Sequence, residues 1–542
     1  MSGTAGLREE CGVSHEGGSS RSLLLQSRAF DIFPGSMFRG FQQNRDSMLS
    51  LDIRDGSDDF RASPYENLTR FQHRVIPPSP PPTPPKNILP STILITGGTG
   101  FLGKLVIEAL FRRQSEFPFD RIVLLARGKR GQDPQARFRN TVATSPCFSN
   151  LSPSWMDQVQ IVEGDVTKDK CGMRPELYRE ICRDVTHIIH CAASIKFDNP
   201  IKDAMKSNIG GTVNVCLLAD KCRRLERLLM TSTAYVTPHT RDPIGEELAP
   251  LPLPVDKLKQ IIKEGKISES EILKLTGHEN TYTLTKCMAE HYIDEWSKTL
   301  PITIVRPSII SASRKFPFPG WIDSPAAFAG LVIGLSSGML KVLDGSRSVK
   351  LDVVPVDDVA AEIINQTFLT GHEPSRIAYA VSTLTNALDI DETGITIMTY
   401  FNQTASKPAP KIMFCKHKSF EHRFLDICYH QLPLMAGKFY YSTKRNEAMK
   451  YKIGKLSGLI SAVNRAFPYF CHNTFDFRPQ KDLYDGEAFD TQAYVVTVCK
   501  GVQQHILNQR RAPVVSAKKK GGKATKGAPG DEADCGTFRE GD

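Results

Sequence analysis

The fold is decided by residues 93–103, which read Ile93-Leu94-Ile95-Thr96-Gly97-Gly98-Thr99-Gly100-Phe101-Leu102-Gly103. The apolar start predicts a strand and the residues from Leu105 to Leu110 predict a helix, so the glycines occupy a strand-to-helix turn. Glycine lets the backbone approach a pyrophosphate, and the helix start offers free N–H groups and a positive dipole end to phosphate. A tight turn without a ligand is the alternative. The predicted cofactor contacts in this turn are Gly97, Thr99, Gly100, Phe101, Leu102 and Gly103.

The alternation of strand and helix continues downstream of this turn. Further strands are predicted at 121–126, 159–162, 187–191, 228–231 and 302–305. Such alternation predicts an α/β fold, a Rossmann-like doubly wound parallel sheet with helices on both faces. The charged helical stretch 245–280 interrupts the pattern and is a candidate lid or insertion.

Four segments are predicted along the chain. Residues 1–86 end in a proline-rich run and form a disordered extension. Residues 87–400 hold the dinucleotide-binding domain with its substrate-binding portion, and residues 416–511 a smaller, mostly helical C-terminal domain. Residues 512–542 are a disordered Lys/Gly-rich tail.

Composition excludes several classes of protein. The 542 residues are 40% hydrophobic and 24% charged, as in soluble globular proteins. Thirteen scattered cysteines without a Cys-x-x-Cys pair indicate reduced thiols, and no metal site is predicted. No convincing membrane span or secretory signal is present. The net charge of +10 is partly in the tail, which is either solvated or in contact with an anionic surface.

The end of the second predicted strand indicates which nicotinamide cofactor binds. Arg127, Lys129 and Arg130 follow it, and no acid stands among them. An acid would hydrogen-bond the 2′-hydroxyl of NAD, whereas a basic residue accommodates the 2′-phosphate of NADP. The sequence therefore predicts NADP(H), with a solvated basic loop as the alternative. After the third strand, Asp165 is a candidate acceptor for the adenine amino group, or only a turn residue.

Tyr282 and Lys286 are the candidate catalytic pair, because residues four apart on a helix share one face. Tyrosine, with a pKa of about 10, is a poor acid–base catalyst near neutral pH, and a nearby ammonium would lower that pKa. A hydroxyl at a strand end would complete the site, with Thr233 as first choice and Ser232 as second. An amphipathic surface helix and a strand end that caps a turn are the alternatives.

This combination resembles the extended short-chain dehydrogenase/reductases and, within them, the fatty acyl-CoA reductases. The closer match is carried by the glycine turn and by residues 232–236, 280–286, 305–310, 316–323 and 352–359. The most family-specific part is Phe316-Pro317-Phe318-Pro319-Gly320-Trp321. The match covers about 90–390 and continues more weakly to about 508. It departs at Thr474-Phe475-Asp476-Phe477, where the family usually has a tryptophan, and no terminal hydrophobic anchor is expected.

The resemblance implies NADPH-dependent reduction of a long-chain fatty acyl-CoA, through an aldehyde, to the fatty alcohol. Thr233 and Tyr282 would bind the developing oxyanion, Tyr282 would donate the proton, and Lys286 would tune it and hold the nicotinamide ribose. Residues 316–328 would line an acyl channel, or pack in the core. Further implied cofactor contacts are Arg127, Lys129, Asp165, Val166, Ala192, Ala193, Tyr282, Lys286 and Pro307.

The expected location is the cytoplasm or, peripherally, a cytosol-facing membrane of the endoplasmic reticulum or peroxisome. The expected partners are a fatty acyl-CoA and a membrane surface, and no nucleic acid is expected. Two alternatives stay open. The protein is an NADP-dependent reductase that stops at the aldehyde or acts on a sterol or sugar, or it is a non-catalytic NADP-binding scaffold, which the presence of both Tyr282 and Lys286 disfavours.

Overall fold

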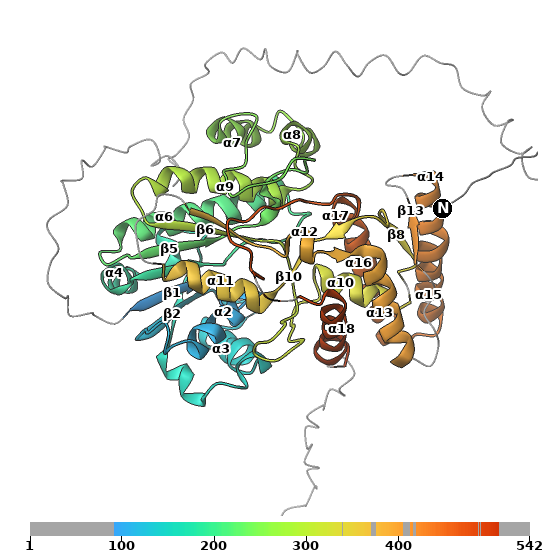
Figure 1. Cartoon of the computed structure of the whole chain (residues 1–542), viewed down its shortest axis with the longest axis horizontal. Coiled ribbons are helices and arrows are strands. Elements are labelled where there is room, and N and C mark those ends of the chain that lie inside the picture. Colours follow the sequence, from blue (N-terminus) through green and yellow to red (C-terminus); the bar gives the residue numbers. More distant parts are fainter. Residues whose placement is uncertain are drawn as a thin grey trace, which may run out of the picture. The chain divides into compact units, whose positions relative to one another are not determined.

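The computed structural model describes residues 91–508, except 130, 339, 370–375, 405–411, 416–418, 486 and 488. The predicted N-terminal extension, the Lys-rich tail and Arg130 lie outside the described residues. The central feature is a seven-stranded sheet (Figure 1). Its strands are β1 (Thr92–Thr96), β2 (Arg121–Ala126), β3 (Val159–Glu163), β4 (His187–His190), β5 (Arg227–Thr231), β6 (Ile302–Pro307) and β11 (Arg376–Ala380). They are ordered β11-β6-β5-β4-β1-β2-β3, and every neighbouring pair is parallel.

Six of the seven strands form where the sequence predicts them, and β11 was not predicted. The central strands are apolar runs buried on both faces. In β1, Ile93, Leu94 and Ile95 are fully buried. The helices α2 (Phe101–Arg112) and α11 (Val356–Thr367) pack together on one face of the sheet, and α4 (Pro175–Asp184), α6 (Gly211–Lys221) and α9 (Thr281–Ser297) lie on the other (Figure 1). This arrangement confirms the predicted Rossmann-like, doubly wound α/β fold.

The order of the strands in the sheet reverses at β1. β2 lies on one side of β1 and β4 on the other, so the strand order reverses between β1 and β4. In open parallel sheets ligands bind outside the carboxyl ends of the strands at this switch point. The glycine turn at residues 97–100 follows β1 directly and therefore lies at that crevice.

Shorter elements complete the unit around the sheet. The charged stretch 245–280 contains α7 (Val255–Glu264) and α8 (Glu269–Thr276), which pack on α9. Three two-stranded pairs are β7 (Ile309–Ser311) with β10 (Val353–Pro355), β8 (Val342–Asp344) with β13 (Met413–Cys415), and β9 (Lys350–Leu351) with β12 (Leu388–Asp389). The remaining short helices include α3 (Pro134–Phe138), α5 (Ile201–Met205) and α12 (Thr383–Asn386).

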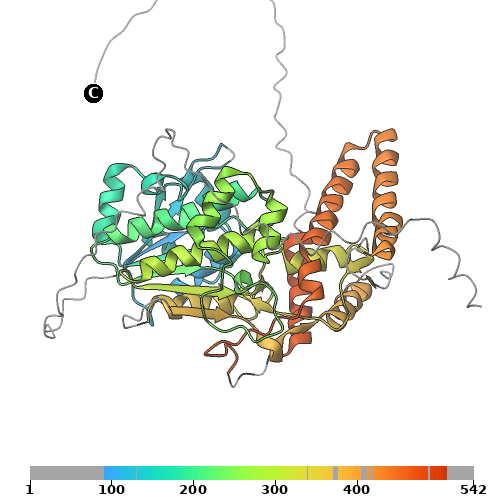
Figure 2. The same cartoon turned by 90° about the horizontal axis from the view of Figure 1, so that it is seen from above.

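The C-terminal region is helical, as predicted. Its helices are α13 (Ile390–Thr404), α14 (Phe420–Asp426), α15 (Leu432–Thr443), α16 (Glu447–Ala466), α17 (Pro468–His472) and α18 (Thr491–Gly501). α13 packs against α18, and α10 (Phe328–Ser336) packs against α13 and α16, so elements from before and after residues 405–411 share one core. α15 and α16 form an antiparallel hairpin, drawn in orange in Figure 2. Within the described residues, no helix combines the length and apolarity that crossing a bilayer requires.

Candidate active site

The glycine turn is shaped by close backbone packing. Gly97 has a φ of 78°, and a Cβ on it would lie 2.6 Å from the backbone N of Ala192, just after β4. A Cβ on Gly103 would lie 2.4 Å from the carbonyl oxygen of Gly97. Both glycines are therefore needed for β1, α2 and β4 to approach one another, a requirement that adds to the predicted access for a pyrophosphate. Gly100 is the N-cap of α2, and no side chain caps that helix start.

The family-specific segment around Trp321 packs on the first turn of α2. Trp321 is 1% exposed and stacks on Phe101 with ring centroids 5.1 Å apart, while Lys104 forms an ion pair with Asp323. Phe328 is fully buried in the core. Core packing, the alternative to an acyl channel, therefore accounts for both Trp321 and Phe328.

Two guanidinium groups lie beside the glycine turn. Arg127 follows β2 and lies 3.7 Å from the carboxylate of Asp165. Arg137, from α3, donates to the hydroxyl of Thr99 at 2.6 Å and to the carbonyl of Arg127 at 3.0 Å. Burial and the nearby Arg127 lower the pKa of Arg137. Sequence reasoning missed Arg137 because nothing local distinguishes it, and only tertiary folding brings it to Thr99.

The remaining predicted cofactor contacts follow the carboxyl ends of the strands. Lys129 forms an isolated backbone bridge with Gln132 in the loop after β2. Asp165 and Val166 follow β3, Ala192 and Ala193 follow β4, and Pro307 ends β6. The N–H of Ala192 donates to the hydroxyl of Thr96 at 3.3 Å. Asp165 accepts from the N–H and the hydroxyl of Thr167, so it also shapes its own turn.

Tyr282 and Thr233 meet beside this edge of the sheet. The side chain of Asn280 accepts from the N–H of Thr283 at 2.9 Å and so starts α9, which places Tyr282 in the first helical turn. Thr233 follows β5, and its hydroxyl lies close enough to the phenol of Tyr282 to influence the pKa of that phenol. Burial raises the pKa of Tyr282 to about 12, and the nearby hydroxyl of Thr233 opposes that shift. The contact favours Thr233 over Ser232.

Lys286 lies one turn further along α9 and points at the end of β5. Its ammonium donates to the carbonyl oxygen of Thr231 at 2.6 Å. Burial lowers the pKa of Lys286 to about 8, and the carboxylate of Glu290 opposes this shift. The predicted lowering of the Tyr282 pKa by Lys286 is not what the structure gives, because burial of the phenol dominates and raises its pKa.

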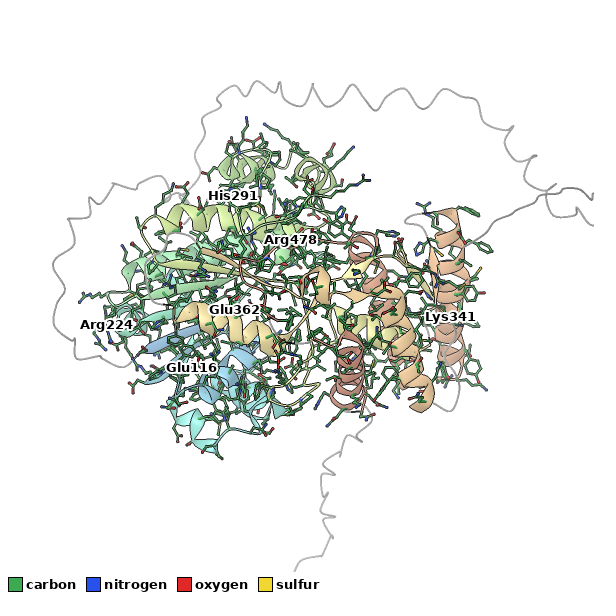
Figure 3. All side chains as sticks on the ribbon, in the orientation of Figure 1. Glu116, Arg224, His291, Lys341, Glu362 and Arg478 are labelled. Carbon is green, nitrogen blue, oxygen red and sulfur yellow. The ribbon has the colours of Figure 1, made fainter. Side chains whose placement is uncertain are left out.

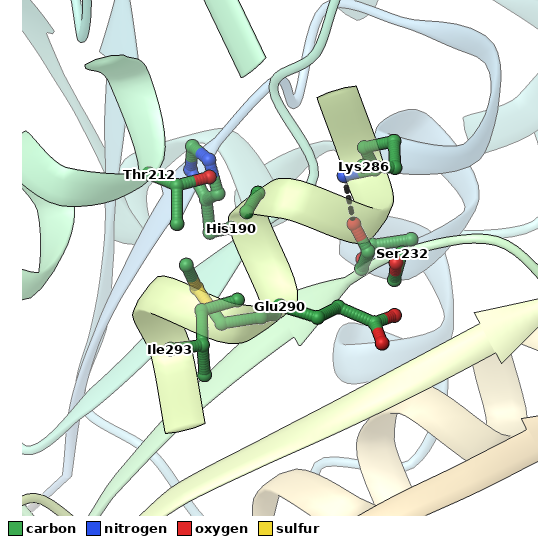
Figure 4. Close-up of a pocket in the computed structure, with 9 residues that line it drawn as sticks. His190, Thr212, Ser232, Lys286, Glu290 and Ile293 are labelled. Atoms are coloured by element: carbon green, nitrogen blue, oxygen red, sulfur yellow. Dashed lines mark hydrogen bonds between the residues drawn. The ribbon is translucent and has the colours of Figure 1, made fainter. Parts of the chain in front are cut away.

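A small cavity lies next to Lys286, between α6, α9 and the ends of β4 and β5 (Figure 4). Its lining residues include His190, Ser232, Lys286 and Glu290. The ring of His190 is paired with Thr96 at 2.7 Å, and burial together with Lys286 lowers the pKa of His190 to about 3, which keeps it neutral. Within the described part of the chain, the buried hydroxyl of Ser232 has no hydrogen-bond partner.

Behind the cavity is a buried ion pair that sequence reasoning missed. Glu290, one turn after Lys286 on α9, contacts Arg306 of β6 at 2.5 Å, and both side chains are at most 1% exposed. Arg306 also donates to the hydroxyl of Tyr379 at 3.3 Å. The ion pair forms because α9 packs over β6. The position of Glu290, four residues after Lys286, is the one sequence signal that could have indicated it.

An apolar wall flanks the phenol of Tyr282. The ring of Phe197 lies 5.7 Å from that of Tyr282 and 6.4 Å from that of Phe470, which is in α17. Phe470 also contacts Tyr235, two residues after Thr233, at 4.7 Å. The C-terminal helices thus contribute directly to the surroundings of the site. In the described residues, no group of three or more His, Cys, Asp or Glu side chains could hold a metal ion.

The sequence has clear relatives. The family profile described as Male sterility protein matches residues 95–363. The chain is 28% identical over 456 residues to fatty acyl-CoA reductase 1 of Mus musculus, with 79% of this chain and 87% of the relative covered. It is 29% identical over 405 residues to fatty acyl-CoA reductase wat of Drosophila melanogaster, covering 71% and 75%.

Solved structures support the fold. The terminal R domain from the myxalamid PKS-NRPS pathway aligns with a TM-score of 0.54 at 20% identity and covers 76% of this chain and 91% of its own. The reductase domain of a nonribosomal peptide synthetase from Mycobacterium tuberculosis aligns with a TM-score of 0.51 at 16% identity, covering 77% and 92%. At this identity the likeness shows the fold alone.

Proposed function

Because this chain belongs to the fatty acyl-CoA reductase family, we propose that it uses NADPH to reduce a long-chain fatty acyl-CoA, through an aldehyde, to the fatty alcohol. Family membership makes the chain an oxidoreductase with an NAD(P)-binding domain. The observation that carries the proposal is the Thr233 hydroxyl close to the buried phenol of Tyr282 at the carboxyl edge of the sheet, with Lys286 one turn away. The alternative of a non-catalytic scaffold offers no reason for this arrangement.

The residues at the switch point fit an NADP molecule. The uncapped start of α2 offers free N–H groups and a positive dipole end to a pyrophosphate. Arg127, whose side chain is 63% exposed, and the half-buried Arg137 supply guanidinium groups where a 2′-phosphate would lie. Arginine pairs phosphate bidentately, and two arginines after the carboxyl end of β2 favour NADP over NAD.

When bound, NADPH supplies one hydride to the thioester carbonyl carbon, and a second NADPH supplies another to the aldehyde. The hydroxyls of Tyr282 and Thr233 would donate hydrogen bonds to the oxygen on which negative charge develops. With a pKa of about 12, Tyr282 is protonated at neutral pH and can donate the proton that oxygen needs. The C–S bond then breaks, coenzyme A leaves as the thiol, and the aldehyde is reduced in turn.

The apolar wall beside the phenol suits a hydrocarbon chain. Phe197 places its ring next to Tyr282, and Phe470 packs on Phe197, so an acyl chain that extends past the phenol would meet aromatic side chains. Apolar walls with few polar groups are what ligand sites for such chains need. We further propose that the protein works in the cytoplasm or at a cytosol-facing membrane of the endoplasmic reticulum or peroxisome, where long-chain substrates partition.

Product analysis tests the proposed function. Purified full-length protein is incubated with a panel of acyl-CoAs and either NADPH or NADH, and the lipid products are separated by chromatography. We expect fatty alcohol, two NADPH consumed per alcohol and one free thiol released. Aldehyde as the only product would replace the alcohol-forming assignment with that of a reductase that stops at the aldehyde. Failure to form either product from any acyl-CoA would contradict the proposal.

Reversal of the charge at position 127 should change the preference of the protein for NADPH over NADH. Arg127→Asp is expected to weaken NADPH binding by about 10- to 100-fold and NADH binding much less, because it removes one charge-assisted contact to the 2′-phosphate. Binding is measured by fluorescence titration with both cofactors. Arg139→Asp, at an exposed position near Arg137, is the matched control and should leave both affinities unchanged. Equal losses for NADPH and NADH in Arg127→Asp would remove Arg127 from the 2′-phosphate site.

A further inference from the structure

The hairpin of α15 and α16, taken from here on together with the preceding helix α14, exposes an unusual amount of apolar surface. Of the fifteen large apolar side chains that are exposed in the described residues, nine lie between 420 and 451. Phe420 is 86% exposed and Phe439 is 73% exposed. Single exposed apolar side chains are ordinary, but a cluster on one element marks an interaction site. The cluster that we call the outer stripe consists of Phe420, Phe424, Ile427, Leu432, Met435 and Phe439.

Helical spacing puts each half of the outer stripe on one helix face. Phe420, Phe424 and Ile427 recur at i, i+4 and i+7, and Leu432, Met435 and Phe439 at i, i+3 and i+7. A different row turns inward, since His430 is 1% and Leu434 7% exposed. His430 accepts from the N–H of Lys341 at 3.0 Å and anchors the hairpin to β8. The inner row holds the hairpin in place, so the outer stripe is not needed for folding.

Positive charge surrounds the outer stripe. Residues 419–466 contain eight Lys or Arg and three Asp or Glu, a net charge of 8 − 3 = +5 out of the +10 of the whole chain. Lys455 lies over the ring of Tyr451 at 4.5 Å, and Lys341 over that of Tyr429 at 5.6 Å. Figure 3 shows Lys341 beside α15. The exposed cations of the hairpin are Arg423, Lys438, Lys444, Arg445, Lys450, Lys452 and Lys455.

We propose that the outer stripe lies in the headgroup region of a bilayer that carries anionic lipids, with the flanking cations against the headgroups. Exposed Phe and Tyr interleaved with Lys and Arg are the composition of helices that lie in a membrane interface. A net charge of +5 is complementary to an anionic leaflet. A second copy of the chain would bring two surfaces of like charge together, which disfavours a dimer through this face.

The test measures binding to lipid vesicles and does not depend on catalytic activity. Full-length protein is sedimented with vesicles of phosphatidylcholine alone or with about one third phosphatidylserine, at low and high salt. We expect binding to the anionic vesicles that falls as salt rises, because salt screens exposed charges. Phe424→Ser combined with Phe439→Ser should lower the affinity at least about tenfold, since two apolar anchors are lost. Ile395→Ser, at a 60% exposed position of α13, is the matched control and should bind like the wild type.

Three outcomes would overturn the proposal. The wild type could fail to bind anionic vesicles, or the double variant could bind as tightly as the wild type, which would assign binding to another segment such as the Lys-rich tail. The lipid-free wild type could also self-associate in a way that the double variant abolishes, which would make the stripe an interface between copies. The proposal extends the membrane location proposed above, but loss of product formation and loss of vesicle binding are separate results and distinguish the two.

Discussion

Tyr282→Phe is expected to lower kcat for acyl-CoA reduction by about 10²- to 10⁴-fold, the usual contribution of a positioned acid–base group. The substitution removes only the hydroxyl that meets Thr233, and it keeps the ring that packs on Phe197. NADPH affinity should therefore stay within about twofold of the wild type, since Lys286 and the glycine turn are untouched. Steady-state kinetics and a fluorescence titration with NADPH measure the two effects.

The same substitution elsewhere on α9 controls for a general effect of losing a phenol. Tyr292 is buried and donates to Asp256 at 2.8 Å, about 15 Å further along the helix. Tyr292→Phe should lower stability modestly and leave kcat near that of the wild type. Unchanged turnover in Tyr282→Phe would exclude Tyr282 as the proton donor, and a loss of NADPH binding in that variant would show that the phenol mainly serves the cofactor.

Glu290→Gln is expected to lower the free energy of unfolding by about 3–5 kcal/mol, as removal of one partner from a buried ion pair does. Glu290 and Arg306 are both buried at a separation of 2.5 Å, so the substitution leaves the guanidinium of Arg306 without a counter-charge inside the protein. Denaturant unfolding of the wild type and the variant at neutral pH measures this loss.

The same variant should change how activity depends on pH. Burial lowers the pKa of Lys286 to about 8 and the carboxylate of Glu290 opposes that shift, so its loss should lower this pKa further. The ammonium of Lys286, which we expect to hold the ribose, is lost as pH rises through this value. Therefore kcat/KM should decline above about pH 8 in the wild type and from a lower pH in Glu290→Gln. The contribution of Lys286 to the free energy of unfolding changes with pH in the opposite direction to the activity. Between the folded pKa and the usual value near 10.5 the unfolded chain binds more protons, so this group's contribution to stability rises with pH.

A surface acid on the same helix provides the control for both measurements. Glu295 pairs with Lys298 at 2.6 Å, and both side chains are more than half exposed. Glu295→Gln should leave the stability and the alkaline decline unchanged, because solvent screens exposed pairs. An alkaline decline that stays in place in Glu290→Gln, in spite of the lost stability, would limit Glu290 to a structural role.

Sequence patterns predicted the sheet and the core of the candidate site because both depend on local, periodic signals. A strand buried on both faces must be an apolar run, as Ile93 to Ile95 are. A turn so close to another backbone that a Cβ would lie 2.6 Å from it must contain glycine, as at Gly97. Two residues four apart on a helix must share a face, as Tyr282 and Lys286 do. Each of these conditions restricts the residue types at particular positions, so it can be recognised from the sequence without knowledge of the rest of the fold.

The properties that set the chemistry came only from the tertiary structure. The contact of Arg137 with Thr99 joins residues 38 apart, and the pairing of Glu290 with Arg306 joins a helix to a strand. The pKa of Tyr282 rises instead of falling because dense packing removes water from the phenol, an effect that no spacing of residues records. By itself the sequence determined six strands of the sheet and which residues stand at their ends. Folding decided which charges become neighbours and how far each is withdrawn from water, because both depend on atoms that are distant along the chain.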